Sequence, residues 1–384
     1  MDATKPNRRK RKRPSFPKVC AEFERKLLEN VLPRIKNSGD TFAAIGIDMA
    51  AQERKWGVSV LTTKDEMSKG TLRLLLPHSF EIDGFGRKYP MKPSGALLSR
   101  LFAGLMECKV TTAVAVDVPF GWPLEHKAFL ETWSALGSVL PAGEELPLRK
   151  RFEYRLCDLT LMECLGEQDC STSIFPVGAD KIASAAFEWA KLRHTVLGRF
   201  GSVDLGYLAN PAHGGVTFIE TYPSAFVRLN YPSCTEYKTG KLDQREGADG
   251  QKKAKKASKE KARFMLMERL VREYQLVHDG TEECAKAACS TSASDPIDGF
   301  LSAIAAWDYL KWSCVKPSLL RISSPLTLLG PERAAEERDR VNKEGWILVR
   351  LPDSCDPKPA VECDRGSTQR TGLDSMAQGK RMLP

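Results

Sequence analysis

The chain has 384 residues, of which 42% are hydrophobic, and this is enough apolar material for a large folded core. Its 58 Lys and Arg side chains outnumber its 49 Asp and Glu side chains, which gives a formal net charge of +9. The sequence contains no apolar run of about 18 residues, and its basic N-terminus lacks the apolar core of a secretion signal. The 11 cysteines include no Cys-x-x-Cys pair, which argues against zinc ribbons and thioredoxin-type chemistry. We therefore expect an intracellular protein without a membrane partner.

Two segments carry the excess of positive charge. Residues 1–14 hold seven Lys or Arg and one Asp, and residues 249–263 hold seven Lys or Arg and two acids, so the segments carry +6 and +5 and leave −2 for the remainder. Their composition is typical of nuclear localisation signals and of segments that bind nucleic acid. A solvated tail without either role is the alternative for the first segment. The basic residues predicted to contact nucleic acid are Arg9, Lys10, Arg11, Lys12, Arg13, Lys252, Lys253, Lys255 and Lys256.

The apolar pattern predicts one large domain over residues 41–352, after a basic disordered arm and leading helix (1–40) and before a disordered tail (353–384). Strands are predicted at 43–48, 56–62, 71–76, 111–118 and 216–221, with a last short strand or packed segment at 345–351. Helices are predicted at 20–37, 94–108, 125–137, 154–165, 178–198, 259–274 and 295–312, and a short one from Ser224. Residues 238–262 are expected to form a Lys-rich, low-complexity insertion.

The spacing of these elements predicts the fold class. The first three strands follow one another closely, which favours an antiparallel meander. The later strands alternate with helices, as in sheets whose faces are covered by helices. The sequence therefore predicts an α/β fold with a mixed sheet flanked by helices, and with helical and Lys-rich insertions.

Three acids stand at the ends of apolar elements that lie far apart in the sequence. Asp48 closes the first predicted strand, Asp117 closes a later one, and Asp298 lies in the first turn of a helix. Carboxylates at the ends of neighbouring strands converge, and Mg²⁺ and Mn²⁺ prefer oxygen ligands of this kind. Two such ions, ~3.5–4 Å apart, clamp both oxygens of a phosphoryl displacement. These acids therefore predict a metal-dependent hydrolase, in which at least one of them is crowded by like charge and holds a proton near neutral pH.

Each acid also has a structural interpretation. Asp48 and Asp117 both precede segments with turn residues. Asp295 is a good helix N-cap, because Pro296 follows it at the first helical position. We therefore prefer Asp298 to Asp295 as a metal ligand and expect it to lie near two other carboxylates in the metal-free protein.

Glu220 and the pair Arg155 and Asp158 are further candidates. Glu220 ends a buried strand, so it is either a catalytic acid or metal ligand, or a cap of the helix that follows. Arg155 and Asp158 are three residues apart, so they are either accessory site residues or an exposed ion pair on a helix. Phe120, Trp122 and Trp56 either stack on bases or belong to the core and its turns.

Eight short phrases, in this order along the chain, resemble the domain-of-unknown-function 429 family. They span roughly residues 43–352 and read Gly46-Ile47-Asp48, Val116-Asp117-Val118-Pro119 with Gly121 and Pro123, Arg155-Leu156-Cys157-Asp158, Ala179-Asp180-Lys181-Ile182, Glu220-Thr221-Tyr222-Pro223, Tyr237-Lys238, Asp295-Pro296-Ile297-Asp298 and Glu344-Gly345-Trp346-Ile347. The family is regarded as predicted nucleases of the RNase H-like superfamily.

The resemblance implies an RNase H-like sheet with three antiparallel strands followed by parallel strands, and helices on both faces. It also implies Mg²⁺ or Mn²⁺ as cofactor. The matching metal acids are Asp48, Asp117 and the Asp295 and Asp298 pair, and the last helix resembles that of RuvC-type resolvases. Glu220, Arg155 and Asp158 match family positions without an assigned role. Cys157 stands where the family pattern leads us to expect Thr.

Three functions compete. The first is a nuclease that hydrolyses phosphodiester bonds of nucleic acid with Mg²⁺ or Mn²⁺. The second is a nucleic-acid-binding protein that keeps the fold with little or no activity. The third is an ATPase related to actin and sugar kinases, which also begins with a strand that ends in Asp. The third ranks last, because Met49-Ala50-Ala51-Gln52 follows Asp48 and provides no glycine to bind phosphate.

Overall fold

A computed structural model of the chain describes most of the predicted domain. The described residues are 21, 25, 29, 32–50, 56–63, 73–74, 79–81, 88–90, 94–124, 126, 153–165, 180–200, 204–205, 215–240, 248–277, 295–314 and 321–352. Within these ranges, no helix combines the length and the apolar character that a membrane crossing requires.

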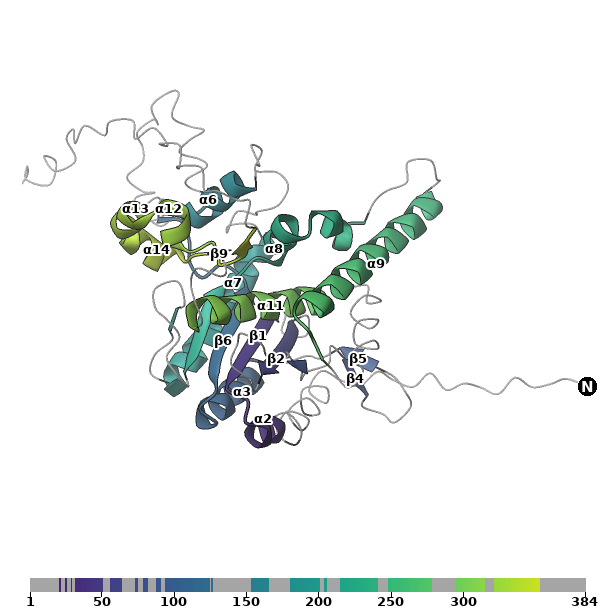
Figure 1. The fold of residues 1–384 in the computed structure, drawn as a ribbon. Helices are drawn as coiled ribbons and strands as arrows, with labels where there is room; N and C mark the ends of the chain where they lie inside the picture. Colours follow the sequence, from purple (N-terminus) through teal and green to yellow (C-terminus); the bar gives the residue numbers. More distant parts are fainter. Residues whose placement is uncertain are drawn as a thin grey trace, which may run out of the picture.

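A six-stranded mixed sheet lies at the centre of the fold (Figure 1). Its strands lie in the order β3-β2-β1-β6-β8-β7. The pairs β3-β2 and β2-β1 are antiparallel, and the pairs β1-β6, β6-β8 and β8-β7 are parallel. The prediction of antiparallel strands followed by parallel ones is therefore confirmed. The strands are β1 (Phe42–Asp48), β2 (Gly57–Thr63), β3 (Arg73–Leu74), β6 (Thr111–Asp117), β7 (Asp204–Leu205) and β8 (Val216–Glu220).

Two small strand pairs lie outside this sheet. Strand β4 (Ser79–Glu81) pairs with β5 (Lys88–Pro90), and β9 (Arg321–Ile322) pairs with β10 (Arg350–Leu351). The predicted last strand at 345–351 is thus only partly formed. Ile347 makes an isolated parallel bridge to Glu220 at the end of β8, so this segment extends the hydrogen bonding of the main sheet by one residue.

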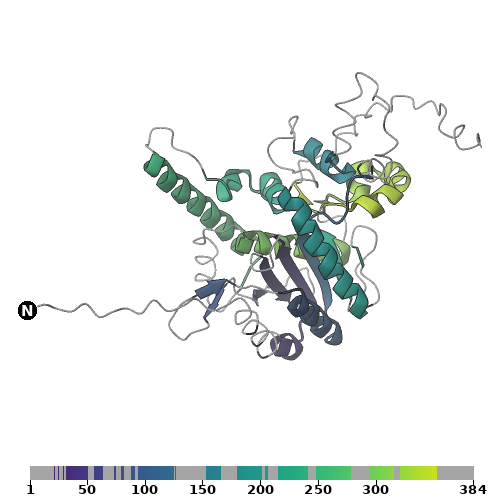
Figure 2. The same ribbon diagram turned by 180° about the vertical axis from the view of Figure 1, so that it is seen from behind.

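Helices cover both faces of the sheet. One face carries α3 (Gly95–Glu107) and α7 (Asp180–Phe200), with α2 (Leu32–Ser38) against α3 (Figure 2). Helix α11 (Asp295–Cys314) crosses the other face over β1, β2 and β6 (Figure 1). The remaining helices are α6 (Leu156–Cys164), α8 (Pro223–Asn230), the 3-10 helix η4 (Pro232–Tyr237), α9 (Ala248–Glu273), α12 (Pro325–Leu329), α13 (Pro331–Glu336) and α14 (Arg338–Glu344).

The two faces of the sheet differ in side-chain size, because successive strand residues point to opposite faces. Large residues join the core beneath α3 and α7, among them Ile45, Ile47, Val114 and Val116. The α11 face has smaller residues, among them Ala44, Gly46, Ala113 and Ala115. Helix α11 therefore packs closer to the strands than large side chains would permit.

Two glycines mark the closest approach of α11 to the sheet. A Cβ atom on Gly46 would lie 2.0 Å from both the Ala303 nitrogen and the Gly299 oxygen of the α11 backbone. A Cβ atom on Gly299 would lie 2.7 Å from the carbonyl carbon and oxygen of Gly57. These contacts are backbone to backbone, so no side-chain rotation relieves them.

The Lys-rich segment over 238–262 is largely helical, so the helix predicted at 259–274 begins earlier than expected. Residues from Ala248 onward belong to α9, a helix of 26 residues that projects from the body of the fold (Figures 1 and 2). The physical reason is composition, because Lys, Ala and Glu are strong helix formers even where their repetition is typical of disorder. Apart from His126, the predicted helix at 125–137 lies outside the described residues, as do the arm over residues 1–20 and the tail over 353–384.

The contact at Gly46 leads to a first prediction. Gly46→Ala should lower the free energy of unfolding by about 3 kcal/mol or more, because a methyl group between two packed backbones overfills the core. Gly104→Ala is the matched control, since its added methyl group meets only the flexible end of the Leu32 side chain. Urea denaturation of both variants measures the difference. Equal costs for the two substitutions would contradict the close contact.

Candidate functional site

Strand register brings Asp48 and Asp117 side by side. They are Cα partners at the carboxyl ends of the parallel strands β1 and β6. Alternation along each strand puts them on the α11 face, two residues beyond Gly46 and Ala115. Both side chains are partly buried. The sheet thus presents two adjacent carboxylates at one edge, toward the first turn of α11.

The third acid, Asp298, reaches this edge from α11. Its side chain is 3% exposed. The Tyr237 hydroxyl donates a hydrogen bond of 2.9 Å to Oδ1, and the Lys238 ammonium lies 3.1 Å from Oδ2. Asp298 acts electrostatically on Asp117, as expected for neighbouring carboxylates, but the sequence arguments did not foresee that Tyr237 and Lys238 bind its two oxygens. The helix begins at Asp295 as predicted, but the Asp295 side chain lies outside the described residues.

Lys238 is the positive charge of this group of acids. Burial opposes its charge, but Asp298, Tyr237, Asp117 and Asp48 together raise the pKa of Lys238 well above its usual range. Its ammonium therefore lies within electrostatic reach of all three predicted acids. We call Asp48, Asp117, Asp298 and Lys238 the acid cluster.

Helix α9 holds the segment that supplies Lys238. The Arg263 Nε donates a hydrogen bond of 2.8 Å to the carbonyl oxygen of Tyr237, and the Ser258 hydroxyl lies 2.6 Å from a carboxylate oxygen of Glu236. The Arg263 side chain is buried, so this anchor belongs to the core. The Lys-rich helix and the acid cluster are therefore parts of one packed unit.

Asp117 is a member of the cluster whose ionised form is disfavoured by its surroundings. Its pKa is raised from 3.8 to about 7, because burial and the charges of Asp298 and Glu220 raise it by more than Lys238 lowers it. The prediction that a crowded acid holds a proton near neutral pH agrees with this value. Such a carboxyl gains from any cation that replaces the proton.

The described part of the chain contains no group of three or more His, Cys, Asp or Glu side chains arranged to hold a metal ion. The pairing of Asp298 with Lys238 is consistent with this. Asp48 and Asp117 remain as two neighbouring carboxylates, and Mg²⁺ is commonly held by one or two carboxylates together with water and substrate oxygens. The chemistry of this pair therefore fits one hard cation with an incomplete protein shell.

A comparison with known protein families identifies the family to which the chain belongs. The family described as "Protein of unknown function (DUF429)" matches residues 46–311. The chain belongs to the DUF429 family. Searches among curated proteins and among solved structures gave no match. The matched range includes the entire acid cluster.

A buried ionic network lies beside the acid cluster in this DUF429 domain. Arg155 is 1% exposed, and its guanidinium binds Asp158 through Nε at 3.0 Å and Nη2 at 3.0 Å. The same guanidinium binds Glu220 at 2.8 and 2.6 Å and the Glu344 carbonyl at 3.1 Å. All five donors of the guanidinium are thereby used. Although burial opposes the charge, Asp158 and Glu220 raise the pKa of Arg155 well above its usual value.

This network corrects two interpretations. Arg155 and Asp158 do form an ion pair, but it is buried rather than exposed on a helix surface. Glu220 does not cap α8, which begins after Tyr222. Its carboxylate binds Arg155 and accepts a hydrogen bond of 2.9 Å from the Phe120 amide. Glu220 is paired in register with Val116 rather than Asp117, so strand alternation turns it away from the acid cluster.

Glu344 extends the network to the C-terminal part of the domain. Its two carboxylate oxygens accept hydrogen bonds of 2.8 Å from the amides of Leu124 and Leu156. At Gly345, where φ is +83°, a Cβ atom would lie 2.9 Å from a carboxylate oxygen of Glu220. Glycine is needed here for both conformation and space. The network thus holds together the turn after β6, the end of β8, the start of α6 and the end of α14.

The basic residues and aromatic candidates have different outcomes. Lys252, Lys253, Lys255 and Lys256 are exposed on α9, whereas Arg9, Lys10, Arg11, Lys12 and Arg13 lie outside the described residues. Trp56 is buried and donates its indole N–H to the Ala50 carbonyl, so it is a core residue. Trp122 is 38% exposed on the turn after β6.

The sequence arguments did not assign a role to Tyr237, Lys238 or Tyr222. Burial raises the pKa of Tyr222, and Lys238, Asp117 and Asp298 also act on it, so its hydroxyl belongs at the edge of the acid cluster. The only signal in the sequence was the occurrence of Tyr237-Lys238 and Tyr222 in the phrases that resemble the family. A tyrosine or lysine in a polar segment carries no pattern that distinguishes a site residue from a surface residue.

The contacts of Asp298 lead to a second prediction, made for the metal-free protein in EDTA at pH 8. Asp298→Asn should lower the free energy of unfolding by about 1–3 kcal/mol, because it removes a buried carboxylate that accepts from both a lysine and a tyrosine. Asp117→Asn should leave it equal or higher. The raised pKa of Asp117 means that its ionised form destabilises the fold. The contribution of Asp117 to stability is therefore fully present below about pH 4 and is lost as the pH rises through about 7.

Urea unfolding of the two variants beside the wild type measures this contrast. The substitutions are chemically identical, so each serves as the control for the other. A stability loss for Asp117→Asn as large as that for Asp298→Asn would contradict the assignment of Lys238 and Tyr237 to Asp298.

Proposed function

We propose that this DUF429 protein is a metal-dependent nuclease of the RNase H type. The observation that carries the proposal is the pairing of Asp48 with Asp117 at the carboxyl ends of β1 and β6, beneath the first turn of α11 with Asp298. The order of the sheet supports it as well, because three antiparallel strands followed by parallel strands is the arrangement that the RNase H resemblance implies.

Asp48 and Asp117 are the residues that would hold a Mg²⁺ or Mn²⁺ ion in this proposal. When bound, such an ion activates water and stabilises the charge that develops on the phosphate. The residues of the chain have three tasks around it. Asp48 and Asp117 supply hard oxygen ligands, α11 carries Asp298 to the same edge, and Tyr237 with Lys238 fixes the orientation of the Asp298 carboxylate.

Lys238 has a second task in the proposed reaction. Its side chain is 30% exposed, although its ammonium is paired with Asp298. An ammonium at the rim of a carboxylate cluster attracts a phosphate that the carboxylates would otherwise repel. We therefore assign to Lys238 the binding of the substrate phosphate next to Asp298.

Helix α9 supplies positive charge that leads away from the cluster. Gly240, two residues after Lys238, is so close to this helix that a Cβ atom would lie 2.2 Å from the Lys255 carbonyl oxygen. Lys252, Lys253, Lys255 and Lys256 are exposed on the part of α9 near this contact. A nucleic acid bound at Lys238 would therefore find further cations along its backbone.

A second candidate function is nucleic-acid binding without cleavage. The pairing of Lys238 with Asp298 favours it, because an internal cation takes the place that a second metal ion would need. In this alternative the acid cluster is a structural remnant, and the lysines of α9 perform the function. The two functions differ in whether Asp48 and Asp117 matter for the chemistry.

The third prediction separates the two functions. The wild-type protein should cleave at least one of labelled single-stranded DNA, duplex DNA, RNA or RNA–DNA hybrid when Mg²⁺ or Mn²⁺ is present. Asp48→Asn should reduce this cleavage by roughly 100-fold or more, since a neutral amide is a poor ligand for a hard cation and even outer contacts of metal sites are worth about 10–100-fold. It should also weaken Mn²⁺ binding in calorimetry.

Asp339→Asn is the matched control, because Asp339 is an exposed residue of α14 that pairs with Lys343. It should change neither cleavage nor Mn²⁺ binding. The nuclease proposal would be replaced by the binding function if two results occurred together. The wild type would cleave no substrate, and Asp48→Asn would bind nucleic acid in EDTA as well as the wild type does.

The fourth prediction concerns the positive segments. Lys253→Gln with Lys256→Gln should flatten the dependence of log affinity on log salt by about 0.7 to 0.9 for each lysine that contacts a phosphate. Deletion of residues 1–17 should flatten it further if the arm also binds. The double variant Lys36→Gln with Lys343→Gln removes the same charge from exposed positions elsewhere and should have a smaller effect. An equal effect of the two double variants would mean that α9 contributes to binding only through the net charge of the protein.

A further inference from the structure

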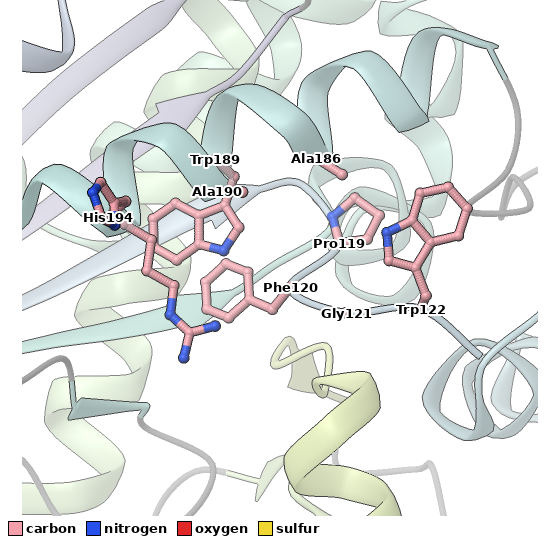
Figure 3. A pocket seen from close by; sticks show the side chains of 9 residues that line it. Pro119, Phe120, Gly121, Trp122, Ala186, Trp189, Ala190 and His194 are labelled. Atoms are coloured by element: carbon pink, nitrogen blue, oxygen red, sulfur yellow. The ribbon is translucent and has the colours of Figure 1, made fainter. Parts of the chain in front are cut away.

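A cavity of about 350 Å³ lies between α7 and the turn that follows β6 (Figure 3). Ala186, Trp189, Ala190, Arg193 and His194 line it from one face of α7, at the spacing of successive helical turns. The turn Pro119–Trp122 crosses this face. The two alanines leave the hollow, because larger side chains at their positions would fill it.

The cavity has an aromatic wall. The ring of Phe120 stacks on that of Trp189, with centroids 4.4 Å apart and planes at 14°. Trp122 is 38% exposed, and its ring is tilted toward His126 at a centroid distance of 5.2 Å. Trp122 thus offers exposed aromatic surface in the cavity lining, on the other side of Pro119 from the stacked Phe120–Trp189 pair.

Two buried hydrogen-bond donors in this wall lack an acceptor. The indole Nε1 of Trp189 and the Nε of Arg193 are buried and have no partner in the described part of the chain. The Trp189 side chain is 2% exposed. In Figure 3 its nitrogen lies on the side of the ring toward Pro119, away from His194. Both groups only donate, and a buried donor without an acceptor is costly, so a ligand whose acceptors reach these nitrogens as it binds would be stabilised.

The cavity is connected to the acid cluster through the turn that follows β6. Its wall begins at Pro119, two residues after Asp117, and the Phe120 amide is bound to Glu220 at 2.9 Å. Glu220 in turn binds Arg155. The cluster lies on the α11 face of the sheet and the cavity lies beside α7 on the opposite face, so a nucleic-acid strand that contacts both passes over the end of β6 along this turn.

We propose that the cavity binds one unstacked nucleobase, with its adjoining phosphate, of a single-stranded nucleic acid whose backbone passes the acid cluster. This inference rests on the proposed function and adds a subsite to it. A base is flat, so it stacks on Trp122, and its ring nitrogens and carbonyl groups supply acceptors for Trp189 and Arg193. The charge of Arg193 complements the adjoining phosphate.

The fifth prediction tests this subsite by binding. A fluorescently labelled single-stranded oligonucleotide and its counterpart with abasic sites are titrated in EDTA, where metal-dependent cleavage is absent, and anisotropy is recorded. The wild type should prefer the intact oligonucleotide. Trp122→Ala should weaken that binding by about 5- to 150-fold, the effect of one to three kcal/mol of base stacking, and should abolish the preference over the abasic strand.

Two further variants guard the interpretation. Phe187→Ala removes another exposed aromatic residue of α7, 65% exposed and outside the cavity lining, and should bind like the wild type. Ala190→Leu fills the hollow without removing a polar group and should act like Trp122→Ala. Equal binding of intact and abasic strands by the wild type, or no binding of either, would overturn the subsite. So would a wild-type affinity in both Trp122→Ala and Ala190→Leu.

The cleavage assay distinguishes this failure from that of the proposed function. Preference for intact strands that depends on Trp122, without cleavage under any metal condition, keeps the subsite and removes the nuclease. Cleavage that depends on Asp48 but is indifferent to Trp122 keeps the nuclease and removes the subsite.

Discussion

The close packing of α11 on β1 is the contact on which the site depends. Gly46 and Gly299 let two backbones approach to a distance that no other residue would allow. The small residues of the strand face beneath α11 continue this contact along the helix. Because α11 lies so near the sheet, a side chain as short as that of aspartate reaches the edge where β1 and β6 end. A methyl group at Gly46 would move the helix outward and separate Asp298 from the other two acids.

Charge balance explains how three carboxylates share this edge without a metal ion. Like charges in a partly buried setting repel, and two features of the structure reduce this repulsion. Lys238 pairs with Asp298, and Asp117 has a pKa of about 7, so that it is partly protonated at neutral pH. Each of these features reduces the net negative charge of the acid cluster. A cation at Asp48 and Asp117 would replace the proton of Asp117 and leave the ion pair of Asp298 with Lys238 intact. Only a second metal ion would require that ion pair to break.

A separate constraint fixes the surroundings. Arg155 holds Asp158, Glu220 and the Glu344 backbone in one buried network, and loss of a partner from such a network leaves an uncompensated buried charge. The same Glu220 carboxylate holds the turn that forms the aromatic wall of the cavity on α7. The acid cluster and the cavity thus lie on two sides of one turn, which is why the proposed base subsite and the proposed phosphate site are assigned to the same nucleic-acid strand.

The sequence by itself determined the strands and the helix that carry the three acids, and with them the first part of the site. Apolar alternation located the strands that end in Asp48 and Asp117, helical periodicity located the helix of Asp298, and the order of short phrases indicated the family. These signals are local, since the period of a strand or helix is written in neighbouring residues. What only the tertiary structure decided depends on pairs far apart in the chain. Asp298 meets Lys238 across 60 residues and Arg155 meets Glu220 across 65, and no periodicity reports such a meeting. Glu220 was misjudged because one residue of strand register decides which face a side chain takes, and the register is set by the partner strand rather than by the sequence around Glu220.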